Sequence, residues 1–185
     1  AWCLIKDLIT KDLSRELLQF GAIATVCDLI PLQGLGRAVL FEGLKEINKN
    51  LQRSSYEESL TLASRTLPFA EAKGKTDHSL GLRTLINEAG IEGPVGSYEI
   101  GHMIGPRLNA IGRLDHAIDA VRLLCTNDPS RAKKLARLLS DKNLERQQLT
   151  ITAVEEAHFQ VDTSLNKKIH ILKSDKWIAG IVGLI

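Results

Sequence analysis

The sequence lacks the patterns that define several common classes of protein. Its three cysteines, Cys3, Cys27 and Cys125, form no CxxC pair and no cysteine/histidine zinc spacing. Widely separated cysteines in odd number are typical of reduced thiols, so we expect a cytoplasmic protein without a disulfide framework. No apolar run approaches the roughly 18 residues that a membrane-spanning helix needs, and no internal repeat is evident.

Short motifs with a defined chemistry are missing as well. The chain contains no GxSxG, no Walker A loop, no GxGxxG and no HExxH. Its five histidines are scattered, and no pair has the spacing of metal ligands on one helix face. The formal net charge of +2 does not by itself identify a nucleic-acid-binding protein, because the local distribution of charge matters more.

What is present is the composition of an ordinary globular protein. The 185 residues are 44% hydrophobic and 25% charged, enough for one domain or for one domain and part of another. The chain opens at AWCLIKDL without a methionine and stops inside the apolar run WIAGIVGLI. Because natural termini are usually polar, we expect a piece from the interior of a longer protein.

The first part of the chain predicts a helix followed by a buried strand. Residues 3–19 have apolar positions at helical spacing. The run FGAIATVCDLIPL, residues 20–32, is almost continuously apolar and is bounded by Gly21 and Pro31. Such a run predicts a strand of a parallel sheet that ends near Asp28.

The middle of the chain predicts short helices separated by loops. Residues 36–50 predict a short helix with a polar stop at its end, and residues 51–79 a helical segment followed by a surface loop. The next helix is expected to end at Gly90 as its C-terminal cap. Residues 91–115 are rich in glycine and proline, which predicts mainly loop.

The last part of the chain predicts a long helix that bridges two packed bodies. Residues 117–125 are helical in pattern, and Asp128 and Pro129 fit the cap and the first position of a new helix. No helix breaker follows for roughly thirty residues, and the middle of this stretch is polar on nearly all sides. KKIHILKSD, residues 167–175, predicts the first strand of a second domain.

These elements predict an α/β fold in three parts. Residues 1–127 would form the C-terminal part of a parallel-sheet domain. Residues 128–162 would form the long connecting helix, and residues 163–185 the first elements of a second domain.

Asp28 is the first candidate for a chemical role. Open α/β sheets bind ligands at the carboxyl ends of their strands, where this aspartate is predicted to lie. A carboxylate there is costly to desolvate unless it is paired or binds a cation. The alternative is structural: Asp28 caps a turn before Pro31 or pairs with Arg37.

The second candidate is GPRLNAIGRLDHA, residues 105–117, where Arg107, Asn109 and Arg113 lie among glycines. Glycine lets a backbone approach a ligand closely, and arginine offers a rigid fork of donors to phosphate. The alternative is a structural loop whose arginines pair with carboxylates such as Asp115. The residue types alone favour neither interpretation.

The long predicted helix carries a basic face that fits two interpretations. Such a face can line a nucleic-acid channel, but it is also typical of a solvated helix with ion pairs at helical spacing, and charge alone favours the solvated helix. The basic residues are Arg131, Lys133, Lys134, Arg137, Lys142 and Arg146.

Several segments, in order, resemble the RecJ family of single-strand-specific exonucleases within the DHH phosphoesterase superfamily. ATVCDLIPL, residues 24–32, resembles the family's fourth motif, and IGPRLNAIGRLDHAIDAVRLL, residues 104–124, is similar to its PRLNAAGR segment, the most specific match. LARLLSDKNLERQQ resembles the start of the family's long connecting helix. WIAGIVGLI, residues 177–185, resembles the opening of the DHH-associated domain.

The resemblance implies a hydrolase that degrades single-stranded DNA from its 5′ end in DNA repair and recombination. A pair of Mn²⁺ or Mg²⁺ ions would activate water, and Asp28 would be one catalytic metal ligand. Arg107 and Arg113 would contact phosphate, and Asn109 would organise the loop. Single-strand-binding protein or a helicase would be expected partners. The three parts of the chain would then be the end of the DHH domain, the connecting helix and the start of the DHH-associated domain.

The chain departs from the family in ways that leave alternatives open. Ala24 stands where the family usually has glycine, and the DHH triplet and the earlier aspartate motifs are absent. Since one aspartate cannot hold two metals, we expect this chain alone to be an inactive nuclease with weak metal affinity. Phosphodiesterases for oligonucleotides or cyclic dinucleotides, and a non-catalytic replication scaffold, are the alternative functions.

Overall fold

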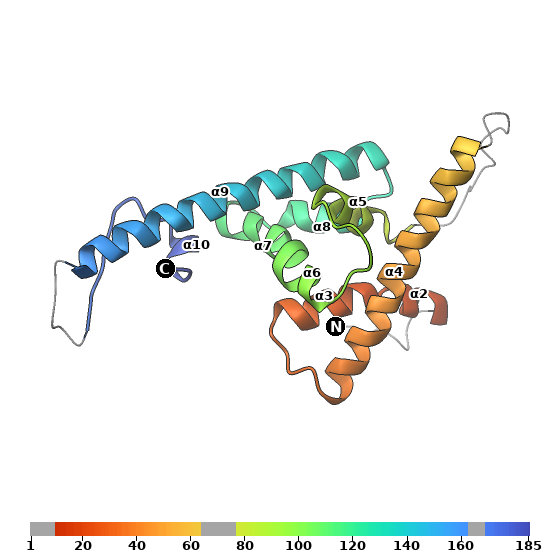
Figure 1. The fold of residues 1–185 in the computed structure, drawn as a ribbon, viewed down its shortest axis with the longest axis horizontal. Coiled ribbons are helices and arrows are strands. Elements are labelled where there is room, and N and C mark those ends of the chain that lie inside the picture. The colour runs from red at the N-terminus through yellow and green to blue at the C-terminus, as the bar shows by residue number, and fades with distance from the viewer. Residues whose placement is uncertain (1–9, 64–76, 163–168) are drawn as a thin grey trace.

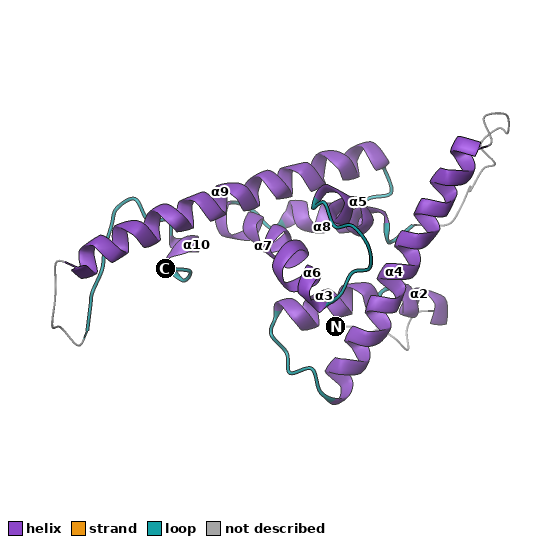
Figure 2. Ribbon diagram, viewed as in Figure 1, coloured by secondary structure: helices purple, strands orange, loops and turns teal. Residues whose placement is uncertain are grey.

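The structure, a computed structural model, describes residues 10–63, 77–162 and 169–185. Within these ranges the chain is helical and contains no strand (Figure 2). The described part of the protein therefore shows the helical elements of the predicted fold. It does not show the predicted parallel sheet.

Three helices form the first layer. Thr10 caps α2 (Lys11–Glu16) with a side-chain oxygen that accepts from the Leu13 backbone N–H at 3.3 Å. Next come α3 (Leu18–Cys27) and the long α4 (Gly34–Ala63), which pack closely together (Figure 1). A Cβ at Gly43 would lie 2.4 Å from the Leu18 carbonyl oxygen, so only glycine permits this approach of α3 and α4.

The strand predicted for residues 20–32 is wrong, because residues 20–27 lie in the helix α3 and residues 28–32 form the irregular turn that follows it. An apolar run without clear periodicity fits a buried helix as well as a buried strand, because burial on several sides removes the pattern that separates them. The helical form satisfies the backbone within the segment, and the Thr25 hydroxyl adds a 2.7 Å bond to the Gly21 carbonyl. No neighbouring strand exists among the described residues to offer the alternative pairing.

The polar stop predicted at the end of residues 36–50 is also wrong, because α4 continues to Ala63. Asn48 does not terminate the helix since its side chain bonds a distant segment. Its amide donates to the Val95 carbonyl at 2.9 Å, and its oxygen accepts from the Val95 N–H at 2.7 Å. A residue typical of helix ends therefore holds the loop before α6 against the side of α4.

The second layer contains α5 (Leu80–Glu88), α6 (Ser97–Glu99), the π-helix η1 (Ile100–Ile104), α7 (Gly105–Leu114) and α8 (Ile118–Cys125). The predicted end of α5 is confirmed, since Gly90 has a left-handed φ of 68°. The predicted helix over residues 117–125 is confirmed by α8.

The loop predicted over residues 91–115 is wrong for most of its length, because α6, η1 and α7 follow one another without a break. Pro106 lies in the first turn of α7, where a helix tolerates a missing N–H. Gly105 serves close packing: a Cβ there would lie 2.5 Å from the Cys27 sulfur. Glycine and proline here mark a helix start and a tight contact with α3.

The long connecting helix is confirmed as α9 (Pro129–Asp162), whose 34 residues span about 50 Å. Asp128 caps it by accepting from the Ser130 N–H at 2.8 Å. The first half packs on α5, α7 and α8 through the buried Ala132, Ala136 and Leu139. The second half extends beyond these helices and carries the C-terminal segment (Figure 1).

The C-terminal segment docks on the second half of α9 without forming a strand. Residues 169–175 of the predicted strand are irregular, and Ile171 is 92% exposed. The described residues contain no strand that could pair with this stretch. Glu156 holds the segment by accepting from the Ser174 hydroxyl and the Trp177 indole N–H, each at 3.0 Å. The chain then ends in the short α10 (Ala179–Val182). Residues 167 and 168, and residues 3–9 of the first predicted helix, lie outside the described residues.

Candidate nucleic-acid site

Asp28 lies at the C-terminal end of α3, not at the end of a strand. Its backbone N–H donates to the Ala24 carbonyl at 2.9 Å, and its side chain is exposed. The next residue, Leu29, adopts a left-handed φ of 53°, which turns the chain away from the helix. The alternative pairing with Arg37 is not formed. Asp28 thus combines the end of a helix with a carboxylate open to solvent.

A cleft of about 360 Å³ opens beside this turn. Cys27 and Leu29, on either side of Asp28, line one wall, and η1, α7, α9 and the C-terminal segment supply the others. The volume falls within the roughly 300–1,000 Å³ typical of ligand sites. The polar residues of its lining are Ser97, His102, Asn109, Arg113 and Arg146. The lining therefore holds two guanidinium groups and no carboxylate.

Asn109 and Arg113 of the predicted segment both reach this cleft, because they lie one helical turn apart on α7. Arg113 donates from Nη1 to the Gly180 carbonyl at 3.0 Å, which ties α7 to α10. Its Nε and Nη2 have no hydrogen-bond partner among the described residues. Arg113 forms no ion pair with Asp115, whose carboxylate accepts from the His116 N–H at 2.8 Å. The structural pairing considered for this arginine is therefore not formed.

Arg107, on the same helix, lies against α9 and does not line the cleft. It donates from Nη1 to the Met103 carbonyl at 2.6 Å and from Nε to the Ser140 hydroxyl at 3.3 Å. Partial burial lowers the pKa of its guanidinium, while the charge of Glu88 acts in the opposite direction. These contacts indicate that Arg107 holds α7 against α9. The contact of Arg107 with phosphate stays a prediction.

Arg146 is the cleft residue that sequence reasoning did not single out. It extends from α9 and is half-buried. Its Nε and Nη2 donate to the side-chain oxygen Oδ1 of Asn143 at 3.3 and 3.1 Å. Burial lowers the pKa of its guanidinium, and the nearby charge of Arg113 lowers it further. No local pattern distinguishes Arg146 from the other basic residues of α9, because its proximity to Arg113 arises only from the packing of α7 on α9.

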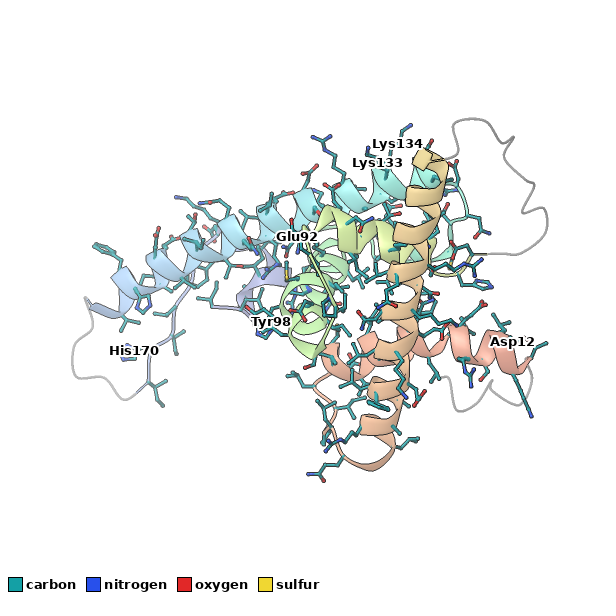
Figure 3. All side chains as sticks on the ribbon, turned by 45° about the vertical axis from the view of Figure 1, so that its right-hand side comes forward. Asp12, Glu92, Tyr98, Lys133, Lys134 and His170 are labelled. Atoms are coloured by element: carbon teal, nitrogen blue, oxygen red, sulfur yellow. The ribbon has the colours of Figure 1, made fainter. Side chains whose placement is uncertain are left out.

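The rest of the basic face of α9 does not converge on the cleft. Lys133 and Lys134 lie near the start of α9, and Figure 3 shows them away from Tyr98, which belongs to α6. Lys142 pairs with Glu145 at 2.8 Å. Of the six basic residues noted on this helix, only Arg146 lines the cleft. The solvated-helix interpretation fits the others.

The described residues do not fit a divalent metal pair. They contain no group of three or more histidine, cysteine, aspartate or glutamate side chains that could hold an ion. Asp28 supplies one carboxylate, and its neighbour Cys27 is a thiol whose pKa is raised by burial and by the charge of Asp28. A two-metal centre requires more oxygen and imidazole ligands than this.

Curated relatives of this chain share one description. The Bacillus subtilis single-stranded-DNA-specific exonuclease RecJ is 28% identical over 94% of this chain and 19% of its own length. The Thermus thermophilus protein of the same name is 29% identical over 92% of this chain and 21% of its own length. No family model matches the sequence.

Solved structures agree with these relatives. An exonuclease RecJ bound to manganese superposes with a TM-score of 0.69 at 28% identity, over 92% of this chain and 36% of that one. RecJ from Thermus thermophilus in complex with Mn²⁺ gives a TM-score of 0.68 over 92% of this chain and 22% of that one. The chain is RecJ-like in sequence and in fold.

The RecJ-like chain spans only about a fifth of the length of the first curated relatives, 19% and 21% for the two proteins above. The predicted resemblance to RecJ is confirmed, since the matches extend over more than nine-tenths of this chain. Among the described residues, no helix is long and apolar enough to cross a membrane.

Proposed function

We propose that this RecJ-like chain is part of a metal-dependent exonuclease that degrades single-stranded DNA from its 5′ end in DNA repair and recombination. The relatives named single-stranded-DNA-specific exonuclease support the substrate class. Similar structures bound to Mn²⁺ or Mg²⁺ support the use of a divalent metal. Residues 1–127, 128–162 and 163–185 then correspond to the end of the DHH domain, the connecting helix and the start of the DHH-associated domain.

The observation that carries the proposal is the composition of the cleft. Arg113 and Arg146 face it from two helices, and the lining contains no carboxylate to neutralise them. Two like charges brought together without a counter-ion favour an anionic ligand, and guanidinium groups match the geometry of phosphate oxygens. A DNA backbone supplies such a ligand, and phosphate contacts provide much of the affinity for it.

Each predicted site residue has a distinct proposed task. Arg113 contacts a phosphate of the strand with the donors that do not bind Gly180, and the Asn109 amide donates to an oxygen of the same backbone. Arg107 keeps α7 in place on α9. Asp28 contributes one carboxylate to a metal centre. The other ligands of that centre would correspond to residues in the parts of the RecJ relatives that this chain does not cover.

The proposal is tested first by DNA binding. Fluorescence anisotropy should show tighter binding of this chain to a single-stranded oligonucleotide than to the blunt duplex of the same sequence. Arg113→Ala should weaken binding and reduce the slope of log K against log salt by about one, since one phosphate contact is lost. Arg122→Ala is the matched control, because Arg122 pairs with Asp119 at 2.8 Å outside the cleft lining.

Cleavage by the protein that carries this chain is the second test. Asp28→Asn should abolish Mn²⁺-dependent cleavage of single-stranded DNA without weakening DNA binding. Cleavage of dinucleotides or cyclic dinucleotides, with long strands left intact, would instead identify a phosphodiesterase for short substrates. Binding without any cleavage by the unsubstituted protein would identify a non-catalytic replication scaffold.

A further inference from the structure

Two aromatic side chains form an exposed stack at the rim of the cleft. The rings of Tyr98 and His102 have centroids 4.5 Å apart and planes inclined by only 17°. Tyr98 is 64% exposed, and His102 is also exposed. A stack that leaves so much aromatic surface in water gains little from burial, so packing alone does not explain the arrangement.

The backbone that carries the stack is held in place by buried residues. His102 belongs to the π-helix η1, a rare element that is frequent at functional sites. Both ends of η1, Ile100 and Ile104, are fully buried. The imidazole Nδ1 lies 3.2 Å from the Tyr98 carbonyl oxygen, a hydrogen bond that orients the ring. Side chains held by a rigid backbone bind a ligand with less loss of conformational entropy.

The stack also lies where a DNA backbone is proposed to bind. His102 lines the same cleft as Asn109 and Arg113, and its ring stacks on that of Tyr98. The other exposed aromatic rings whose side chains the structure describes do not share this position. Phe159 is 72% exposed but lies on the far half of α9, and Phe41 lies beneath the Lys45 ammonium group, 4.1 Å from its ring centroid.

We propose that Tyr98 and His102 form a stacking platform for an unpaired nucleobase next to the phosphate held by Arg113. The proposal rests on the proposed function, because it takes single-stranded DNA as the ligand. Every nucleobase has a π-face, so stacking on aromatic rings tolerates any sequence. It requires a base that is free of its own duplex, and the platform would therefore select single strands where phosphate contacts cannot.

The experiment uses oligothymidylate with one 2-aminopurine, whose fluorescence falls when the base stacks. Titration with this chain should quench the probe. Tyr98→Ala should remove most of the quenching and weaken binding about fivefold or more, whereas Tyr98→Phe should retain both. Phe159→Ala is the matched control and should behave like the unsubstituted chain. His102→Ala should also reduce quenching. The same result in two variants would show that the effect does not come from a local rearrangement in one of them.

The salt dependence separates this inference from the proposed function. Tyr98→Ala removes no phosphate contact, so the slope of log K against log salt should stay unchanged while Arg113→Ala reduces it. Binding that keeps its affinity and its quenching in both Tyr98→Ala and His102→Ala would overturn the platform and leave the proposed function standing. Failure of the unsubstituted chain to bind single-stranded DNA would overturn both.

Discussion

Several single residues in this chain position neighbouring helices through close contacts that only the folded structure reveals. Gly105 is the clearest case, because it brings the start of α7 against the Cys27 sulfur at the end of α3. This contact fixes the wall of the cleft next to Asp28. In the sequence this glycine belongs to a stretch predicted to be mainly loop, because nothing local indicates which residue it contacts.

Gly105→Ala should destabilise the fold by about 1–3 kcal/mol, the usual cost of overpacking. The added Cβ would lie 2.5 Å from the Cys27 sulfur and 2.9 Å from the Ile100 carbonyl oxygen. Gly112→Ala in the same helix is the control, since its Cβ would meet nothing nearer than Ala117 Cβ at 3.5 Å. That change should be neutral or stabilising because alanine favours a helix. Urea unfolding measures both, and equal midpoints would contradict the assignment.

Leu29 illustrates strain at the residue next to the candidate metal ligand. Its φ of 53° is unfavourable for a side chain with a Cβ, and the side chain is 88% exposed, so it gains little in return. Leu29→Gly should therefore raise the free energy of unfolding by up to about 1 kcal/mol.

Leu35→Gly is the matched control for this strain, because Leu35 is also exposed but lies in the first turn of α4. Glycine within a helix costs up to about 1 kcal/mol, so the control should unfold at a lower urea concentration. Shifts of the same sign and size in the two variants would show that the backbone at Leu29 is not strained.

At the scale of elements, α9 connects the second layer of helices with the C-terminal segment. Its first half packs on α5, α7 and α8, and its second half binds the C-terminal segment through Glu156 and Gln160. Arg113 then links α7 to α10 through the Gly180 carbonyl. The position of the Arg113 guanidinium thus depends on how the C-terminal segment sits on α9.

Glu156→Ala should loosen the C-terminal segment without unfolding the helices. The substitution removes one carboxylate that accepts both the Ser174 hydroxyl and the Trp177 indole N–H. Each lost bond leaves a partly buried donor unpaired, at a typical cost of about 1 kcal/mol or more. Hydrogen exchange should rise over residues 173–185 and stay unchanged in α5 and α8.

Glu155→Ala is the control for this change. Glu155 is the neighbouring carboxylate on α9, it is exposed, and it makes no contact with Ser174 or Trp177. Equal exchange in the two variants would show that the Glu156 hydrogen bonds do not hold the segment.

For the whole molecule, sequence patterns predicted the helices better than the arrangement of the site. α8 and α9 were predicted because their apolar spacing and the Asp128–Pro129 start are local signals. The helical form of residues 20–27 was missed because an unbroken apolar run carries no period. Of the three residues predicted to bind substrate, Asn109 and Arg113 line the cleft and Arg107 does not, and their binding roles stay predictions. Arg146 lies 33 positions after Arg113 in the chain and comes near it only through packing.

At the scale of the whole molecule, the proposed function separates DNA binding from metal binding. The cleft arginines need no ion to attract phosphate, whereas Asp28 is a single carboxylate, and no cluster of three or more potential ligands lies among the described residues. EDTA should therefore leave the affinity of this chain for single-stranded DNA unchanged, as measured by anisotropy. Added Mn²⁺ should produce no hydrolysis of the strand by this chain.

The control for this prediction is Asp28→Asn, which should bind single-stranded DNA at least as tightly as the unsubstituted chain, because a negative charge near the phosphate path is removed. Loss of DNA affinity on addition of EDTA would contradict the prediction, since it would require a metal ion to hold the phosphate. Mn²⁺-dependent cleavage that disappears in Asp28→Asn would show that this chain completes the metal centre by itself. DNA affinity without cleavage would instead mean that the arginines of α7 and α9 position the strand while other ligands must join Asp28 before the phosphodiester is cut.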